Sequence, residues 1–142
     1  MSDLPAALTD RTAFLLQLAV ARVQALGEEA LVELGVGGRE YGALAVLAHL
    51  APCTQIAVGR ALGIDRTTTV AVLGGLEERG LVDRSPDPAN RRAYLVSLTA
   101  AGDRVRARAA EVLVACEDRF LAPLDHSERT QLHGTLVRLI RA

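Results

Sequence analysis

Residues 54–102 read TQIAVGRALGIDRTTTVAVLGGLEERGLVDRSPDPANRRAYLVSLTAAG, and this stretch decides the fold. Its first half contains two short helical segments. Thr54 is placed to cap the first, over 55–62, and Asp65 to cap the second, over 66–79. A third short helix is predicted just upstream. Three short helices separated by breaks of three or four residues are typical of a helix-turn-helix.

The second half of the stretch changes period. Residues 81–84 predict a short strand, and 85–92 are rich in turn formers, with two prolines and an asparagine. Residues 93–98 alternate and carry β-forming side chains, so they predict the return strand. A hairpin directly after a helix-turn-helix is a wing.

The segment before the helix-turn-helix predicts a short helix over 39–50, with Leu44, Leu47 and Ala48 facing inward. A longer helix precedes it, from a cap at Thr9 to about Leu34. Its apolar side chains cover nearly the whole circumference, and such a helix must be buried on all sides. A chain of 142 residues has little interior for it. The simplest solution is a second copy of the chain, and the alternative is the central helix of a monomeric bundle.

The segment after the wing predicts two more helices. Thr99 is placed to cap a long one over 100–122, and Asp125 with Glu128 forms a capping-box variant that opens the last. The apolar residues of that last helix recur at helical spacing: Leu132, Leu136, Leu139 and Ile140.

These elements predict a mainly α fold with a small β-hairpin wing, a winged helix-turn-helix flanked by long dimerisation helices. The predicted segments are 1–34 for N-terminal dimerisation, 35–99 for the winged helix-turn-helix and 100–142 for C-terminal dimerisation. We expect them to form one intertwined compact unit.

Composition excludes several classes of function. Only 3% of the residues are aromatic, which excludes a sheet that stacks single-stranded bases. All 16 basic residues are arginine, which excludes a Schiff-base or P-loop lysine. No catalytic or cofactor motif is present, so no enzyme or cofactor is predicted. His49 and Cys53 have the i, i+4 spacing of metal ligands, but Pro52 breaks the helix between them, so no metal is predicted. The net charge of −1 argues against nonspecific binding to nucleic acid.

The sequence shows neither a secretory signal nor a membrane span. The first residues contain no basic run that would open a secretory signal, and no apolar stretch reaches the roughly 20 residues of a membrane span. The two cysteines lie far apart in the sequence, which fits a reducing compartment. We therefore expect a cytoplasmic protein without a membrane partner.

Four fragments, in order, resemble the MarR family of winged-helix transcriptional regulators: LGIDRTT, LEERGLVDR, DPANRRA and LTAAG. The order of the flanking helices is similar too, so the resemblance covers nearly the whole chain. It implies a homodimer on a roughly palindromic double-stranded DNA operator, and we expect the protein to be a repressor. It also implies that the recognition helix enters the major groove, that the wing touches the minor groove, and that a small-molecule effector or an oxidant releases the DNA.

The residues that we expect to contact DNA fall into two groups. In the recognition helix they are Arg66, Thr67, Thr68 and Ala71, and in the wing they are Arg84, Arg91 and Arg92. At 100° per residue, Thr69, Leu73 and Leu76 face inward, whereas Thr67, Ala71, Gly74 and Glu78 face outward. Capping chemistry alone is the alternative interpretation of the threonine run.

Two departures from the family pattern concern DNA reading. The middle of the recognition helix is Val70-Ala71 and Gly74-Gly75, where relatives usually carry polar or basic side chains. An acidic residue that braces a wing arginine in the family is replaced by Asn90, and Asp87 is the candidate substitute. The rival hypothesis is therefore a dimeric ligand-binding or protein-interaction module of the same fold, with weakened DNA reading.

Two further candidate sites follow from the side chains near the recognition helix. A ligand pocket is predicted from Phe14, Leu18 and Leu47, with Tyr41 or His49 as a polar group. Cys53 lies before a helix N-terminus and is a candidate redox residue. It has no cationic neighbour in the sequence, so we expect it to be an ordinary thiol and the release of DNA to depend on a ligand.

Overall fold

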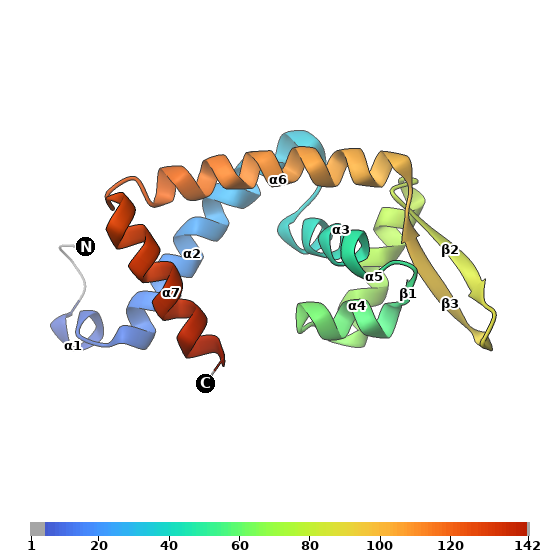
Figure 1. The fold of residues 1–142 in the computed structure, drawn as a ribbon, viewed down its shortest axis with the longest axis horizontal. Coiled ribbons are helices and arrows are strands. Elements are labelled where there is room, and N and C mark those ends of the chain that lie inside the picture. The colour runs from blue at the N-terminus through green and yellow to red at the C-terminus, as the bar shows by residue number, and fades with distance from the viewer. Residues whose placement is uncertain (1–4, 142) are drawn as a thin grey trace.

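The computed structural model describes residues 5–141 and is dominated by helices. Figure 1 shows α6 running along the length of the molecule, with α3, α4, α5 and the sheet near one end and α1, α2 and α7 near the other. In chain order the elements are α1 (Ala6–Thr9), α2 (Thr12–Leu31), a single 3-10 turn η1 (Val32–Leu34), α3 (Gly38–Leu50), β1 (Cys53–Thr54), α4 (Gln55–Leu62), α5 (Arg66–Glu78), β2 (Val82–Asp87), β3 (Asn90–Leu98), α6 (Ala100–Phe120) and α7 (His126–Arg141). The predicted fold class is confirmed.

Local capping chemistry explains where several helices begin. The side-chain oxygens predicted to begin α4, α5 and α6 all accept backbone N–H groups. The pairs are Thr54 with Ala57 (3.3 Å), Asp65 with Thr68 (2.9 Å) and Thr99 with Gly102 (3.0 Å). Before α7, Asp125 and Glu128 exchange side-chain to backbone hydrogen bonds, each of 2.9 Å. Each cap satisfies N–H groups that have no partner within the helix.

The N-terminal segment differs from its prediction. Thr9 ends the short α1 instead of capping a long helix, because its hydroxyl donates to the Ala6 carbonyl of the preceding turn. The long helix α2 begins at Thr12, after Arg11 in extended backbone. The predicted end at Gly35 is confirmed: this glycine adopts the left-handed conformation, with φ of 65°. Residues 1–4 of the predicted N-terminal segment lie outside the described residues.

The sheet has three antiparallel strands in the order β1-β3-β2. The strand β1 was not predicted, because two residues are too few to show an alternating pattern; it pairs Cys53 with Val96. The wing strands β2 and β3 are longer than predicted and leave only Pro88 and Ala89 between them. Pro86 is tolerated because β2 is an edge strand, where a missing N–H breaks no ladder bond to a further strand.

The core lies where α3, α4 and α5 meet the sheet and α6. The predicted inward face of α5 is confirmed, since Thr69, Leu73 and Leu76 are all buried. In α3, Leu44 is buried as predicted, but Ala48 is exposed and Ala43 takes its place. The largest fully buried side chains are Leu31, Leu44, Leu47, Leu73, Leu76, Val58, Val82 and Val96.

The terminal helices expose apolar side chains that the core does not use. The helix α7 buries none of its described residues, and Leu139 and Ile140 are 61% and 83% exposed. In α2, Leu15, Leu16 and Val20 are exposed as well. These side chains leave two apolar helix surfaces uncovered by the rest of the chain. Among the described helices, none is both long and apolar enough to cross a membrane.

Candidate nucleic-acid interface

The outward face of α5 is the first component of the candidate interface. Arg66, Thr67 and Ala71 are exposed, as the helical periodicity predicts. The buried side of the same helix holds it against the core through Leu73 and Leu76. Because one face is fixed and the other is open, α5 can lay its outer face and its first turn against a partner.

Two of the three threonine hydroxyls at the start of α5 form hydrogen bonds within the chain. The Thr68 hydroxyl donates to the Asp65 carboxylate at 2.7 Å, and the Thr69 hydroxyl donates to the Asp65 carbonyl at 2.8 Å. Thr67 has no such internal partner among the residues that the structure describes. Capping chemistry therefore accounts for two of the three threonines, and the Thr67 hydroxyl is left for an external group.

Asp65 keeps its charge at the start of α5. Hydrogen bonds from the Thr68 hydroxyl and the Thr68 backbone N–H hold the pKa of this carboxyl below its usual range. A carboxylate at this position interacts favourably with the positive end of the helix dipole.

The wing arginines take two different positions. Arg84 lies in β2, and its Nε is 3.0 Å from the Glu77 carboxylate of α5, with 24% of the side chain exposed. This ion pair ties the wing strand to α5. Arg91 and Arg92 are exposed and lie on β3, next to the turn, and not in a long loop as predicted. These two side chains are the ones that project from the wing.

The wing turn is held by backbone contacts. The Asp87 carboxylate accepts the Ala89 N–H at 2.9 Å, and the Asn90 side-chain oxygen accepts the Arg92 N–H at 3.1 Å. Both side chains thus hold the turn, and among the described residues neither forms an ion pair with a wing arginine. The expectation that Asp87 substitutes as an arginine brace is wrong, because its carboxylate bonds within the turn.

A contact missed by the sequence analysis joins α5 to the α2–α3 junction. The Arg79 guanidinium donates to the Gly75 carbonyl at 3.0 Å and also to the Gly35 carbonyl and the Glu40 carboxylate. Glu40 in turn accepts the Gly37 N–H at 2.9 Å. Gly35 and Glu40 lie 44 and 39 positions from Arg79 in the sequence, so no local pattern indicates these two contacts.

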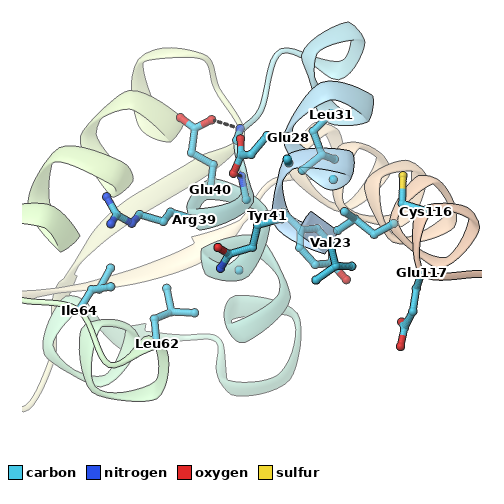
Figure 2. Close-up of a pocket in the computed structure, with 17 residues that line it drawn as sticks. Val23, Glu28, Leu31, Arg39, Glu40, Tyr41, Leu62, Ile64, Cys116 and Glu117 are labelled. Carbon is cyan, nitrogen blue, oxygen red and sulfur yellow. Dashed lines mark hydrogen bonds between the residues drawn. The ribbon is translucent and has the colours of Figure 1, made fainter. Parts of the chain in front are cut away.

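A cavity of about 840 Å³ lies beside this junction, and Figure 2 shows its labelled residues on α2, α3 and α6 and around the end of α4. Apolar side chains such as Val23, Leu62 and Leu113 line it together with four charged groups. Those groups are Glu28, Arg39, Glu40 and Glu117. Volume and composition suit a small organic ligand.

Only one of the five predicted pocket residues lines this cavity, namely Tyr41. Leu47 is buried in the core, and His49 is exposed at the end of α3. Phe14 and Leu18 lie in the N-terminal half of α2, away from the lining residues, which begin at Val23. Helical periodicity indicates apolar side chains along these two helices but does not give the point at which the helices cross.

The two cysteines are both at least partly buried. Cys53 is half-buried, and burial raises the pKa of its thiol. Cys116 is buried, and its thiol donates to the Leu26 carbonyl at 3.5 Å. In the part of the chain that the structure describes, no cluster of three or more His, Cys, Asp or Glu side chains could hold a metal ion.

Comparisons with known proteins point to one family. A profile of the MarR family matches residues 34–93. A relative from Thauera aromatica, named for transcriptional regulation of the hcr operon, is 36% identical over 107 residues, which cover 75% of this chain and 64% of that protein. The chain therefore matches less than two thirds of that relative's length. The transcriptional regulator HosA of Escherichia coli O111:H- is 32% identical over 99 residues, or 70% of this chain and 73% of HosA.

Solved structures extend the similarity over almost all of the chain. A MarR-family transcriptional regulator from Rhodococcus sp. RHA1 has a TM-score of 0.84 at 32% identity and covers 93% of this chain and 94% of its own. The repressor CouR bound to a 23-mer DNA duplex has a TM-score of 0.89 at 27% identity, covering 97% and 99%. CouR from Rhodococcus jostii RHA1 bound to p-coumaroyl-CoA has a TM-score of 0.79 at 32% identity, covering 93% of each chain.

Proposed function

Because the chain belongs to the MarR family of transcriptional regulators, we propose that it is a homodimeric repressor that binds a double-stranded DNA operator and releases it when a small molecule binds. Members of this family regulate transcription and are not enzymes. The observation that carries the proposal is that α5 has an exposed face and that the wing beside it carries two exposed arginines. The Arg84–Glu77 ion pair holds the wing strand against α5.

The proposed contacts with DNA follow from this pairing. Arg66, Thr67 and Ala71 of α5 enter the major groove, and the backbone around the capped Thr68 approaches phosphates. Arg91 and Arg92 of the wing enter the minor groove, where arginine is attracted by the negative potential. Arg84 contributes by holding the wing against α5. The similarity to CouR, which has been solved on a DNA duplex, supports this arrangement.

The proposed dimer is built from the terminal segments 1–34 and 100–142, while 35–99 carries the DNA contacts. The exposed apolar side chains of α2 and α7 support this division, because a helix such as α7 that buries nothing in its own chain needs a partner for its apolar face. A twofold dimer presents two copies of α5 to two half-sites of a palindrome.

The proposed effector site is the cavity beside Arg79. Its lining includes Glu40, which bonds to Arg79 at the end of α5, so a ligand that moves Glu40 also moves the DNA-facing helix. CouR binds p-coumaroyl-CoA, which supports a small-molecule effector in a relative of this fold.

A gel-shift titration tests the proposal. The probe is the duplex upstream of the protein's own gene, and the control is an unrelated duplex of equal length at the same salt concentration. We expect a discrete complex with the mass of a dimer on the upstream duplex at concentrations that leave the control unbound. Equal binding to both duplexes at every salt concentration, or binding to neither, contradicts the proposal.

A second candidate function is favoured by the composition of α5. Its middle carries Val70, Ala71, Gly74 and Gly75, which offer no side-chain hydrogen bonds to bases. This composition fits a dimeric ligand-binding or protein-interaction module with weakened DNA reading. The same titration separates the two, because such a module is a dimer that does not prefer the upstream duplex.

A further inference from the structure

The N-terminal half of the outer face of α5 is rich in methyl groups and has few free hydrogen-bonding groups. Thr67 and Ala71 are exposed, and 42% of the Val70 surface is exposed. The hydroxyls of Thr68 and Thr69 are engaged by Asp65, and the Glu77 carboxylate is engaged by Arg84. On the N-terminal half of this face, Thr67, Val70 and Ala71 therefore present methyl groups together with the Thr67 hydroxyl, and the exposed Glu78 carboxylate lies at the C-terminal end of the face.

Gly74 adds an independent observation on the same face. A Cβ atom built at this position meets no atom within 4 Å, so packing within the chain does not require a glycine. The left-handed glycines of the described residues are Gly35, Gly63 and Gly80, so backbone conformation does not require one at 74 either. A glycine inside a helix lowers helix stability relative to alanine. Close approach of a surface outside the chain is a condition that a glycine at this position would meet.

The chemistry of this face matches one feature of the major groove. Thymine is the base that presents a methyl group there, at C5, and apolar side chains or the threonine methyl contact it. We propose, on the basis of the DNA-binding function above, that Thr67, Val70 and Ala71 read thymine through its C5 methyl group. Gly74 lets the helix backbone come close enough for these short side chains to reach.

Contacts to thymine methyl groups can give sequence specificity to a recognition helix that lacks polar side chains in its middle. Contacts from Arg91 and Arg92 to the minor groove, and from the backbone around Thr68 to phosphates, supply affinity with little information about major-groove sequence. Methyl contacts then supply the discrimination. The operator half-site is accordingly one in which thymines on either strand line the groove opposite α5.

Deoxyuridine substitution tests the proposal directly, because it removes the C5 methyl group and keeps the base-pairing edge. Duplexes are selected on the full-length protein from a pool of random sequence, and the enriched duplexes are made again with deoxyuridine in place of thymidine. We expect the affinity to fall by about fourfold for each contacted thymine, which corresponds to burial of one methyl group. Thymines outside the half-sites serve as the control and should tolerate the replacement.

Two matched glycine variants test the close approach. Gly75 lies in the same helix, but a Cβ there points toward Glu40 of α3 at an ordinary 3.7 Å. We expect both Gly74→Ala and Gly75→Ala to raise the midpoint of thermal unfolding, because alanine favours the helix. Only Gly74→Ala should weaken binding to the selected duplex. Val70→Ala should reduce the difference in affinity between the thymidine and deoxyuridine duplexes.

The outcomes separate this inference from the proposed function. Enriched duplexes that bind equally well with deoxyuridine overturn the methyl reading and leave DNA binding in place. Equal affinities for the Gly74→Ala protein and the unmodified protein overturn the close approach. A selection that enriches no duplex overturns both the inference and the proposed function.

Discussion

Asp65 shows how one residue organises the candidate interface. Its carboxylate caps α5 through the Thr68 N–H and also accepts the Thr68 hydroxyl, while its carbonyl accepts the Thr69 hydroxyl. The cap therefore fixes where α5 begins and which threonine faces outward. Because the pKa of Asp65 is lowered in the folded state, its contribution to stability is present above the unfolded pKa of about 3.9 and is lost as pH falls through the lower folded value.

The thiol of Cys53 should be less reactive than that of an exposed cysteine. Burial raises the pKa of its thiol, so the thiolate fraction at neutral pH is smaller than for an ordinary cysteine, whose pKa is about 8.5. We expect slow alkylation and DNA binding that survives peroxide. Alkylation rates measured against pH on a Cys116→Ala variant isolate Cys53. A thiol pKa below about 7, together with a peroxide-dependent loss of DNA binding that Cys53→Ser abolishes, would make the protein a redox switch instead.

The packing of α4 on α5 depends on a small residue at 59. A Cβ atom at Gly59 would lie 2.5 Å from the Thr69 hydroxyl oxygen and 3.4 Å from the Ile64 carbonyl. We expect Gly59→Ala to lower the free energy of unfolding by about 1–3 kcal/mol, the usual cost of overpacking a core. Urea denaturation measures it. The double variant Gly59→Ala/Thr69→Ala should lose less stability than the sum of the two single variants, because Thr69→Ala removes the closest atom. Purely additive losses in the double variant would refute the proposed clash.

Arg92 of the wing should contribute to DNA affinity independently of the α5 face. We expect Arg92→Ala to weaken binding to many duplexes by a similar factor and to reduce the slope of log affinity against log salt by about 1, because it removes one cation that contacts DNA without reading the major-groove sequence. Fluorescence anisotropy on a panel of duplexes at several salt concentrations measures both quantities. Arg108→Ala removes the same charge from α6 and is the control. An unchanged salt slope for Arg92→Ala would remove the wing from the interface.

The elements differ in how far sequence could predict them, for a physical reason. Caps such as Asp65, Thr99 and Asp125 act within three residues, so the helices they begin were predicted correctly. The same holds for the buried and exposed faces of α5, which follow from helical periodicity. The strand β1 and the full length of the wing depend on pairing with β3, which is a tertiary contact.

The candidate site shows the same division. The exposed positions of Arg66, Thr67, Ala71, Arg91 and Arg92 could be predicted, since they need only periodicity and the wing motif. The Arg84–Glu77 ion pair, the contacts of Arg79 and the cavity could not be, because each joins segments that no local pattern connects.

At the scale of the whole molecule, the uncovered surface of α7 predicts the oligomeric state. Leu139 is 61% exposed in the single chain, and we expect it to be buried in the dimer. Leu139→Asp should give monomers or insoluble protein, because a carboxylate cannot be buried there without a partner. Sedimentation at micromolar concentration measures this. Ile56→Asp, at an equally exposed apolar residue of α4, should stay dimeric, and a well-folded monomer for the unmodified chain would defeat the prediction.

The length of α6 has a mechanical consequence for the molecule. Cys116 borders the cavity, and Ala100 begins the helix at the base of the wing, 16 residues away. At 1.5 Å per residue this arm is about 24 Å long, so a tilt of about 5° about the cavity end swings the wing base by about 2 Å. A packed helix is stiff enough to act as a lever. In the proposed dimer, a ligand that shifted α6 by a fraction of an ångström near its pivot would displace the base of the wing by more, and would thereby change the span between the two copies of α5.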